Sequence, residues 1–168
     1  MTIEQELTLT RVGFRARLEI RHSGSSKLEG LSVALRASPE DSPLEEAIDL
    51  FVLSEPALFG ATSVDGTGKM EPESTAQITW LMVPLTEAAP QFATRYAIGG
   101  VMVYSIDGVE YAQNFSPDTI TVQPDPQLYL TYFHSRVAYS DDPFTSGIVE
   151  PAIPYQLALL IENRGYGD

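Results

Sequence analysis

The stretch that decides the fold reads Val101-Met102-Val103-Tyr104-Ser105-Ile106-Asp107-Gly108-Val109-Glu110-Tyr111-Ala112-Gln113. Two β-type runs flank the dipeptide Asp107-Gly108. Asp-Gly in this position is the strongest short-range signal for a two-residue turn, because both central residues tolerate a positive φ. The stretch therefore predicts an antiparallel β-hairpin.

Similar short segments recur along the chain, with turn residues between them. Alternation of apolar and polar residues predicts half-buried strands at Leu7–Val12, Phe14–His22, Leu31–Arg36, Ala57–Val64, Thr75–Pro84, Tyr96–Ile106, Val109–Phe115 and Thr119–Val122. Within Leu44–Leu53 we expect a strand from about Ile48. Asp65-Gly66 is similar to the hairpin dipeptide, but Thr67-Gly68 after it indicates a longer loop. Trp80 alternates with Ile78 and Met82, which places it in the core. Eight or nine short strands without a long helix predict an all-β fold, an antiparallel immunoglobulin-like β-sandwich.

A faint internal repeat indicates how the chain divides. Phe14–Gly24 aligns without gaps with Tyr155–Gly165, so that Leu18, Ile20 and Gly24 match Leu159, Ile161 and Gly165. Each copy ends in His or Asn, one further residue and Gly, which is typical of a turn that needs a positive φ. We therefore expect a sandwich over residues 1–126. Residues 127–168 are expected to be appended strands and a Pro-containing loop that begin a second repeat.

The composition excludes several classes of partner. The 168 residues carry a net charge of −13, from 23 acidic and 10 basic side chains. Such a surface repels phosphate backbones, so nucleic acid is excluded as a partner. No run approaches the roughly 18 apolar residues of a membrane helix, which argues against membrane insertion. The absence of cysteine excludes thiol catalysis, thiolate metal sites and disulfides.

Two segments show a resemblance to a known family. Phe14–Leu35 contains an alternating strand, a His-Ser-Gly turn and a returning strand, and Met70–Trp80 contains a turn before another alternating strand. Both resemble the immunoglobulin-like modules of large bacterial surface and adhesion proteins, especially the CARDB type. In this sequence Glu73 stands where that family usually has Gly, and His22 replaces its usual Asn. The resemblance implies an extracellular or cell-surface spacer or adhesion role, and it carries no catalytic residue.

The sequence offers no catalytic, cofactor or metal site. Only His22 and His134 could serve a triad, and neither lies in a nucleophile-elbow or zinc-ligand pattern. The pair Asp141-Asp142 lacks the interleaved spacing of a calcium loop, so we expect solvated charge there. Gly99-Gly100 indicates a bulge or close strand packing rather than a phosphate loop. We therefore expect a protein that is not an enzyme and holds no cofactor.

The C-terminal region contains the candidate interface. The terminal strand presents Leu157, Leu159 and Ile161 on one face, and an isolated strand of this kind needs cover. That cover is its own upstream partner near Leu128–Phe133, the first sandwich or another molecule. A long loop with apolar anchors precedes it, and a loop of such length normally has a packing or binding purpose. The candidate interface residues are Tyr139, Asp141, Asp142, Phe144, Leu157, Leu159 and Ile161.

Three functional hypotheses remain open. The first is a non-enzymatic structural or adhesion module of a repetitive extracellular protein, acting as a spacer or protein-interaction domain whose partner is another protein or neighbouring copies of itself. The second is a filament or shell subunit completed by β-augmentation. The third is a carbohydrate-binding accessory domain, in which an aromatic platform would bind a glycan through Tyr96, Tyr104, Tyr111 or Tyr139.

Overall fold

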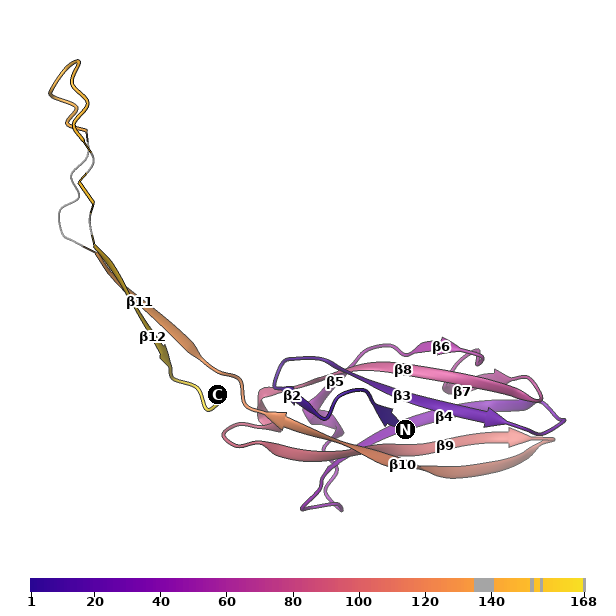
Figure 1. Ribbon diagram of the computed structural model, residues 1–168. Helices are drawn as coiled ribbons and strands as arrows, with labels where there is room; N and C mark the ends of the chain where they lie inside the picture. Colours follow the sequence, from indigo (N-terminus) through magenta and orange to yellow (C-terminus); the bar gives the residue numbers. More distant parts are fainter. Residues whose placement is uncertain (135–140, 152, 155, 168) are drawn as a thin grey trace. The chain divides into compact units, whose positions relative to one another are not determined.

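The computed structural model describes residues 1–134, 141–151, 153–154 and 156–167. The chain forms two compact units, one of Met1–Asp125 with Gly167 and one of Pro126–Tyr166. The first unit is an all-β sandwich of two sheets and the second holds a small two-stranded sheet, so the predicted fold class is confirmed (Figure 1).

The first sheet of the sandwich has the strand order β1-β3-β8-β5, with β6 also paired to β8. Its strands are antiparallel to one another. Strand β3 pairs with β8 along its whole length, from Phe14 opposite Met82 to His22 opposite Ser74. The bounds are β1 Thr2–Ile3, β3 Phe14–His22, β5 Phe51–Leu53, β6 Ala57–Phe59 and β8 Ser74–Pro84.

The second sheet has the order β2-β10-β9-β4-β7. All its pairings are antiparallel except that of β2 with β10, which is parallel. The bounds are β2 Leu7–Leu9, β4 Leu28–Pro39, β7 Asp65–Met70, β9 Thr94–Ile106 and β10 Val109–Gln123. Two short 3₁₀ helices, η1 Ile48–Leu50 and η2 Thr86–Ala88, lie in the connections.

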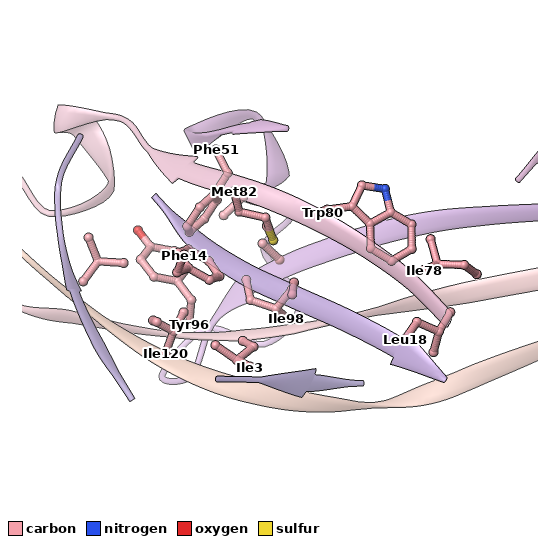
Figure 2. Close-up of a cluster of buried hydrophobic side chains, with 14 of the residues drawn as sticks. Ile3, Phe14, Leu18, Phe51, Ile78, Trp80, Met82, Tyr96, Ile98 and Ile120 are labelled. Carbon is pink, nitrogen blue, oxygen red and sulfur yellow. The ribbon is translucent and has the colours of Figure 1, made fainter. Parts of the chain in front are cut away.

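The core lies between these two sheets (Figure 2). Strand β3 alternates buried and exposed side chains, as the apolar spacing of its sequence requires. Phe51 packs edge to face against both Phe14 and Tyr96, with ring centroids 6.2 and 5.1 Å apart. Trp80 is 5% exposed, so its predicted place in the core is confirmed.

The predicted hairpin is present between β9 and β10. Ile106 pairs with Val109, and the turn residues Asp107 and Gly108 have φ angles of 50° and 79°. Val109–Phe115 and Thr119–Val122, expected as separate strands, are one strand with a register shift between Phe115 and Asp118. The bulge expected near Gly99-Gly100 lies here. A Cβ on Gly100 would stand 2.2 Å from the carbonyl oxygen of Ala34, so the backbones approach too closely for a side chain.

Four segments differ from the expectation. The strand expected over Leu7–Val12 ends at Leu9. Asp65–Gly68, expected as a loop, is part of β7 (Asp65–Met70), which pairs with β4. The strand expected from Ile48 begins only at Phe51, after a 3₁₀ turn. The strand expected over Ala57–Val64 ends at Phe59. Gly60, Gly66 and Gly68 interrupt the local alternation in two of these segments, so tertiary pairing contributes to where the strands form.

The turn after β3 also corrects the interpretation of Gly24. Its φ is not positive. The glycine is required by space, because a Cβ there would lie 2.8 Å from Cε1 of the His22 ring. Nε2 of His22 is 2.7 Å from the carbonyl oxygen of Ser26, so this ring braces the turn.

In the second unit, β11 (Leu128–His134) and β12 (Leu157–Asn163) pair with each other in an antiparallel sheet. We call this sheet the C-terminal ribbon. Strand β3, which the sequence repeat aligns with β12, pairs with β1 and β8, whereas β12 pairs with β11. The repeat therefore conserves a strand pattern but not its pairing.

Candidate interaction surfaces

Strand β2, which follows the short β1, lies beside the end of β10 in the second sheet. Strand β2 pairs in parallel with the end of β10, with Leu7 opposite Thr121 and Leu9 opposite Gln123. The amide of Thr121 donates to the carbonyl of Glu6 over 2.9 Å, and the amide of Thr10 donates to the carbonyl of Gln123 over 2.8 Å. We call this pairing, together with Thr10 and Asp125, the terminal clamp.

Polar side chains extend the terminal clamp beyond the paired strands. Thr10 is fully buried, and its hydroxyl oxygen accepts a hydrogen bond of 3.0 Å from the amide of Asp125. The Asp125 carboxylate lies 3.6 Å from the Arg11 guanidinium. Because parallel strands run in the same direction, a force that pulls the two chain ends apart slides one strand along the other. All the hydrogen bonds of the clamp then resist together.

The C-terminal ribbon has two unequal faces. Residues directly opposite in an antiparallel pair share a face, and successive residues alternate between faces. The register of Leu130 opposite Ile161 and Tyr132 opposite Leu159 therefore defines one face. This apolar face consists of Leu128, Leu130, Tyr132, Leu157, Leu159 and Ile161, with His134 and Asn163 at its ends. Its six apolar side chains are each between 58% and 69% exposed.

The opposite face of the ribbon is mixed. It consists of Tyr129, Thr131, Phe133, Ala158, Leu160 and Glu162. The Arg164 guanidinium lies 4.4 Å from the centroid of the Tyr129 ring and 2.8 Å from the Glu162 carboxylate. This face therefore contains the charged side chain of Glu162, whereas the apolar face contains no Asp, Glu, Lys or Arg.

The candidate interface residues fall into two groups. Leu157, Leu159 and Ile161 lie together on the apolar face. Asp141, Asp142 and Phe144 belong to the connecting segment, where Phe144 is 92% exposed. Tyr139 lies outside the described residues.

The acidic residues of the connecting segment bond to one another's backbone. Asp142 accepts a hydrogen bond of 2.9 Å from the amide of Phe144, and Glu150 accepts one of 2.9 Å from the amide of Asp142. The hydroxyl of Thr145 also donates to Glu150, and this bond, together with the one from the Asp142 amide, lowers the pKa of Glu150 to about 2. These carboxylates therefore organise a local turn.

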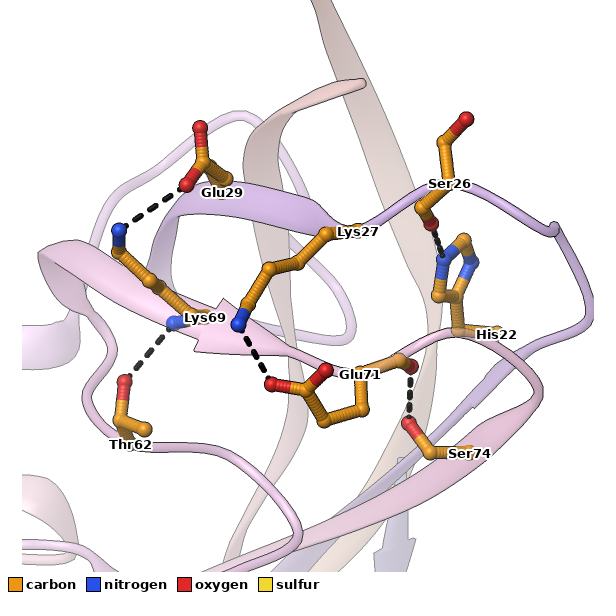
Figure 3. A network of polar contacts seen from close by, with 8 residues as sticks. All are labelled: His22, Ser26, Lys27, Glu29, Thr62, Lys69, Glu71 and Ser74. Carbon is orange, nitrogen blue, oxygen red and sulfur yellow. Dashed lines mark hydrogen bonds and ion pairs between the residues drawn. The ribbon is translucent and has the colours of Figure 1, made fainter. Parts of the chain in front are cut away.

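Both lysines of the chain lie at one edge of the sandwich (Figure 3). The Lys27 ammonium is 2.6 Å from the Glu71 carboxylate, and the Lys69 ammonium is 2.9 Å from that of Glu29. The hydrogen bond with Glu71 raises the pKa of Lys27, and the hydrogen bond with Lys69 lowers the pKa of Glu29. Charged side chains along an edge strand discourage a further strand from pairing there. This network therefore closes the β7 edge.

The expected aromatic platform is wrong for Tyr96. This ring is 2% exposed, and its hydroxyl donates to the carbonyl of Ala88 inside the sandwich. Tyr104 packs against the core and stacks on Tyr111 at 5.6 Å, so Tyr111 presents the exposed ring of that pair. Tyr139 lies outside the described residues.

One of the sandwich's larger hollows, about 510 Å³, includes Asp118 in its lining. The carboxylate of Asp118 accepts a hydrogen bond of 2.7 Å from the amide of Ile3, which holds β1 in place. Within residues 1–134, 141–151, 153–154 and 156–167, no three His, Cys, Asp or Glu side chains gather as metal ligands. The same part of the chain contains no helix of the length and apolarity that crossing a membrane requires.

No family model matches the chain, and no curated protein sequence matches it. Distant structural likenesses to solved proteins include the following three. A family 123 glycoside hydrolase from Clostridium perfringens is 11% identical with a TM-score of 0.41, and the match covers 70% of this chain. The chain spans only 21% of the length of that hydrolase.

The other two are bacterial surface proteins. AggA, the major subunit of aggregative adherence fimbriae type I from Escherichia coli, is 11% identical with a TM-score of 0.37, over 74% of this chain and 93% of its own. The collagen-binding subdomain of the Enterococcus faecalis surface protein ACE is 8% identical with a TM-score of 0.26, over 69% and 92%. These likenesses are too remote to assign a function, and the CARDB resemblance stays a prediction.

Proposed function

We propose that this protein is a non-enzymatic structural module of a repetitive extracellular or cell-surface protein, which acts as a spacer or protein-interaction domain. The observation that carries the proposal is the parallel pairing of β2 with β10. A spacer transmits force through the strands near its two chain ends, and in this sandwich β2, which follows the short β1, and the end of β10 form the terminal clamp.

The geometry of the terminal clamp is suited to resisting a pulling force along its strands. The hydrogen bonds from Thr10 to Gln123 and from Thr121 to Glu6 lie across the direction of pull, so they must break together. Resistance to forced unfolding is set by the unfolding rate rather than by equilibrium stability. The bond from the Asp125 amide to the buried Thr10 hydroxyl adds a further contact at this end of the clamp.

Single-molecule stretching tests the proposal. The chain has no cysteine, so Gln5→Cys and Gln127→Cys give unique attachment points on either side of the clamp. Thr10→Val keeps the shape of the side chain and removes the acceptor of the Asp125 amide, so we expect a lower unfolding force. Thr79→Val, on β8 and away from the clamp, is the matched control and leaves the force unchanged. Equal forces for both variants would refute a load-bearing clamp.

The glycan-binding alternative has less support, because Tyr96 is buried and Tyr104 packs on the core. A glycan array with the whole chain tests it. Binding that Tyr111→Ala abolishes would favour that alternative over the spacer.

A further inference from the structure

We propose that the apolar face of the C-terminal ribbon packs against the same face of a second copy of this chain, as two small sheets stacked face to face. This inference goes beyond the spacer role and does not depend on it. Its starting point is that a two-stranded antiparallel sheet is only marginally stable alone in water, and needs more strands or a packing partner.

The first support is the amount of uncovered apolar surface. A large side chain exposes on the order of 200 Å² when free, so the six apolar residues together present about 700 Å². A standard specific interface buries about 800 Å² on each partner. One ribbon face therefore approaches the size that a stable dimer needs, and Leu128, Leu130, Tyr132, Leu157, Leu159 and Ile161 supply all of it.

The second support is the charge distribution. Two copies of a chain with a net charge of −13 repel each other over most of their surface. The apolar face contains no Asp, Glu, Lys or Arg, so stacking it on itself brings no like charges together. The mixed face differs, because a twofold contact there would bury Glu162 and Arg164.

The third support is the shape of the face. Large side chains stand on both strands, with Leu130 opposite Ile161 and Tyr132 opposite Leu159. Two such sheets pack about 10 Å apart with their inner side chains interdigitated. A twofold contact is isologous, so one self-complementary patch is sufficient for both subunits. Face-to-face stacking also leaves β11 and β12 paired within their own chain, unlike strand exchange.

Sedimentation velocity over a concentration series of the whole chain tests the proposal. We expect a reversible monomer–dimer equilibrium for the wild type. Leu159→Glu, on the apolar face, should weaken dimerisation at least tenfold, and Leu130→Glu on the neighbouring strand should do the same. Leu160→Glu is the matched control: it makes the same change one residue away on the mixed face and should leave the dimer constant within twofold.

Hydrogen exchange separates loss of the dimer from loss of the ribbon. In the wild type, the amides of β11 and β12 should become more protected as concentration rises. A wild type that stays monomeric at every concentration, or a dimer that Leu159→Glu and Leu130→Glu leave intact, would overturn the proposal. A monomer whose thermal midpoint falls on Leu159→Glu would also overturn it, because the face would then be covered from within the chain. None of these outcomes alters the stretching result for the terminal clamp.

Discussion

The hydroxyl of Tyr96 donates a hydrogen bond of 2.7 Å to the backbone carbonyl of Ala88, eight residues earlier in the chain. Tyr96 lies near the start of β9, and Ala88 ends the 3₁₀ turn that leads out of β8. In immunoglobulin-like sandwiches a tyrosine in this position ties the corner between the two sheets. The bond therefore fixes the crossover from one sheet to the other.

Removing this bond should destabilise the sandwich. Tyr96→Phe keeps the ring that packs on Phe51 and leaves a buried carbonyl without its donor, which costs about 1–3 kcal/mol of unfolding free energy. Urea denaturation followed by Trp80 fluorescence measures the change. Tyr111→Phe, at an exposed ring, is the control and should leave the midpoint unchanged. Equal midpoints for both variants would show that the corner does not depend on the bond.

The same residue predicts a loss of stability in alkali. Burial raises the pKa of Tyr96, and the charges of Glu45 and Asp41 add to the effect. Above about pH 10 the unfolded chain loses this phenolic proton while the folded chain retains it, so the free energy of unfolding falls as pH rises. In Tyr96→Phe this contribution to the pH dependence of the free energy of unfolding should disappear. Denaturation curves between about pH 8 and pH 11, a range that spans the ordinary tyrosine pKa, measure it.

Replacing Glu73 with glycine should stabilise the protein. It adopts a φ of 50°, at the turn between β7 and β8 where the resembled family usually has glycine. A side chain in this region costs about 1 kcal/mol, so Glu73→Gly should raise the free energy of unfolding by about 0.5–1 kcal/mol. Glu55→Gly is the control, because its φ is not positive and glycine there only adds freedom to the unfolded chain. Thermal melts that rank Glu73→Gly below the wild type would contradict this account.

The sequence predicts strands well where local alternation determines them. Strand β3 begins at Phe14 and ends at His22 as expected, because its nine residues alternate without interruption. Strand β7 was missed because Asp65-Gly66-Thr67-Gly68 has turn chemistry. It forms a strand through pairing with β4, and the lack of a side chain at Gly68 allows the carbonyl of Ser63 to approach.

The candidate surfaces likewise contain parts that the sequence predicts and parts that it does not. The alternation of Leu157, Leu159 and Ile161 predicts one apolar face, but the contribution of Leu128, Leu130 and Tyr132 depends on the register with β11. The terminal clamp joins residues more than 100 positions apart, and nothing local in Leu7–Leu9 indicates its pairing with Thr121–Gln123. The sequence does not distinguish the buried Tyr96 from an exposed tyrosine. Its hydroxyl donates to the backbone carbonyl of Ala88, and a backbone acceptor leaves no signature in the residue types.

Substitution of Gly108 should lower the free energy of unfolding through backbone strain alone. Its φ is 79°, and no atom lies within 4 Å of the place that a Cβ would take. Gly108→Val forces a β-branched residue into the left-handed region and should cost about 1–3 kcal/mol. Gly108→Asn, which tolerates this region, should cost much less. Chemical denaturation of the two variants decides the point, and equal costs would mean that the hairpin turn lies elsewhere.

Residues 1–126 should fold without the C-terminal ribbon. Every residue of the buried cluster lies between Ile3 and Val122, and the terminal clamp is complete at Asp125. Deleting Gln127–Asp168 removes none of these residues. Circular dichroism and urea melts should therefore show a cooperative β fold of nearly unchanged midpoint.

Deleting Met1–Leu9 is the opposing control for this truncation. It removes β1 and β2, and with them the parallel partner of Thr121–Gln123, so the urea midpoint should fall steeply. If the two deletions were equally damaging, the ribbon would belong to the folding unit of the sandwich and a boundary at residue 126 would be wrong. If the shorter chain folds and sediments as a monomer where the whole chain dimerises, the ribbon is separable from the sandwich in folding and accounts for the self-association.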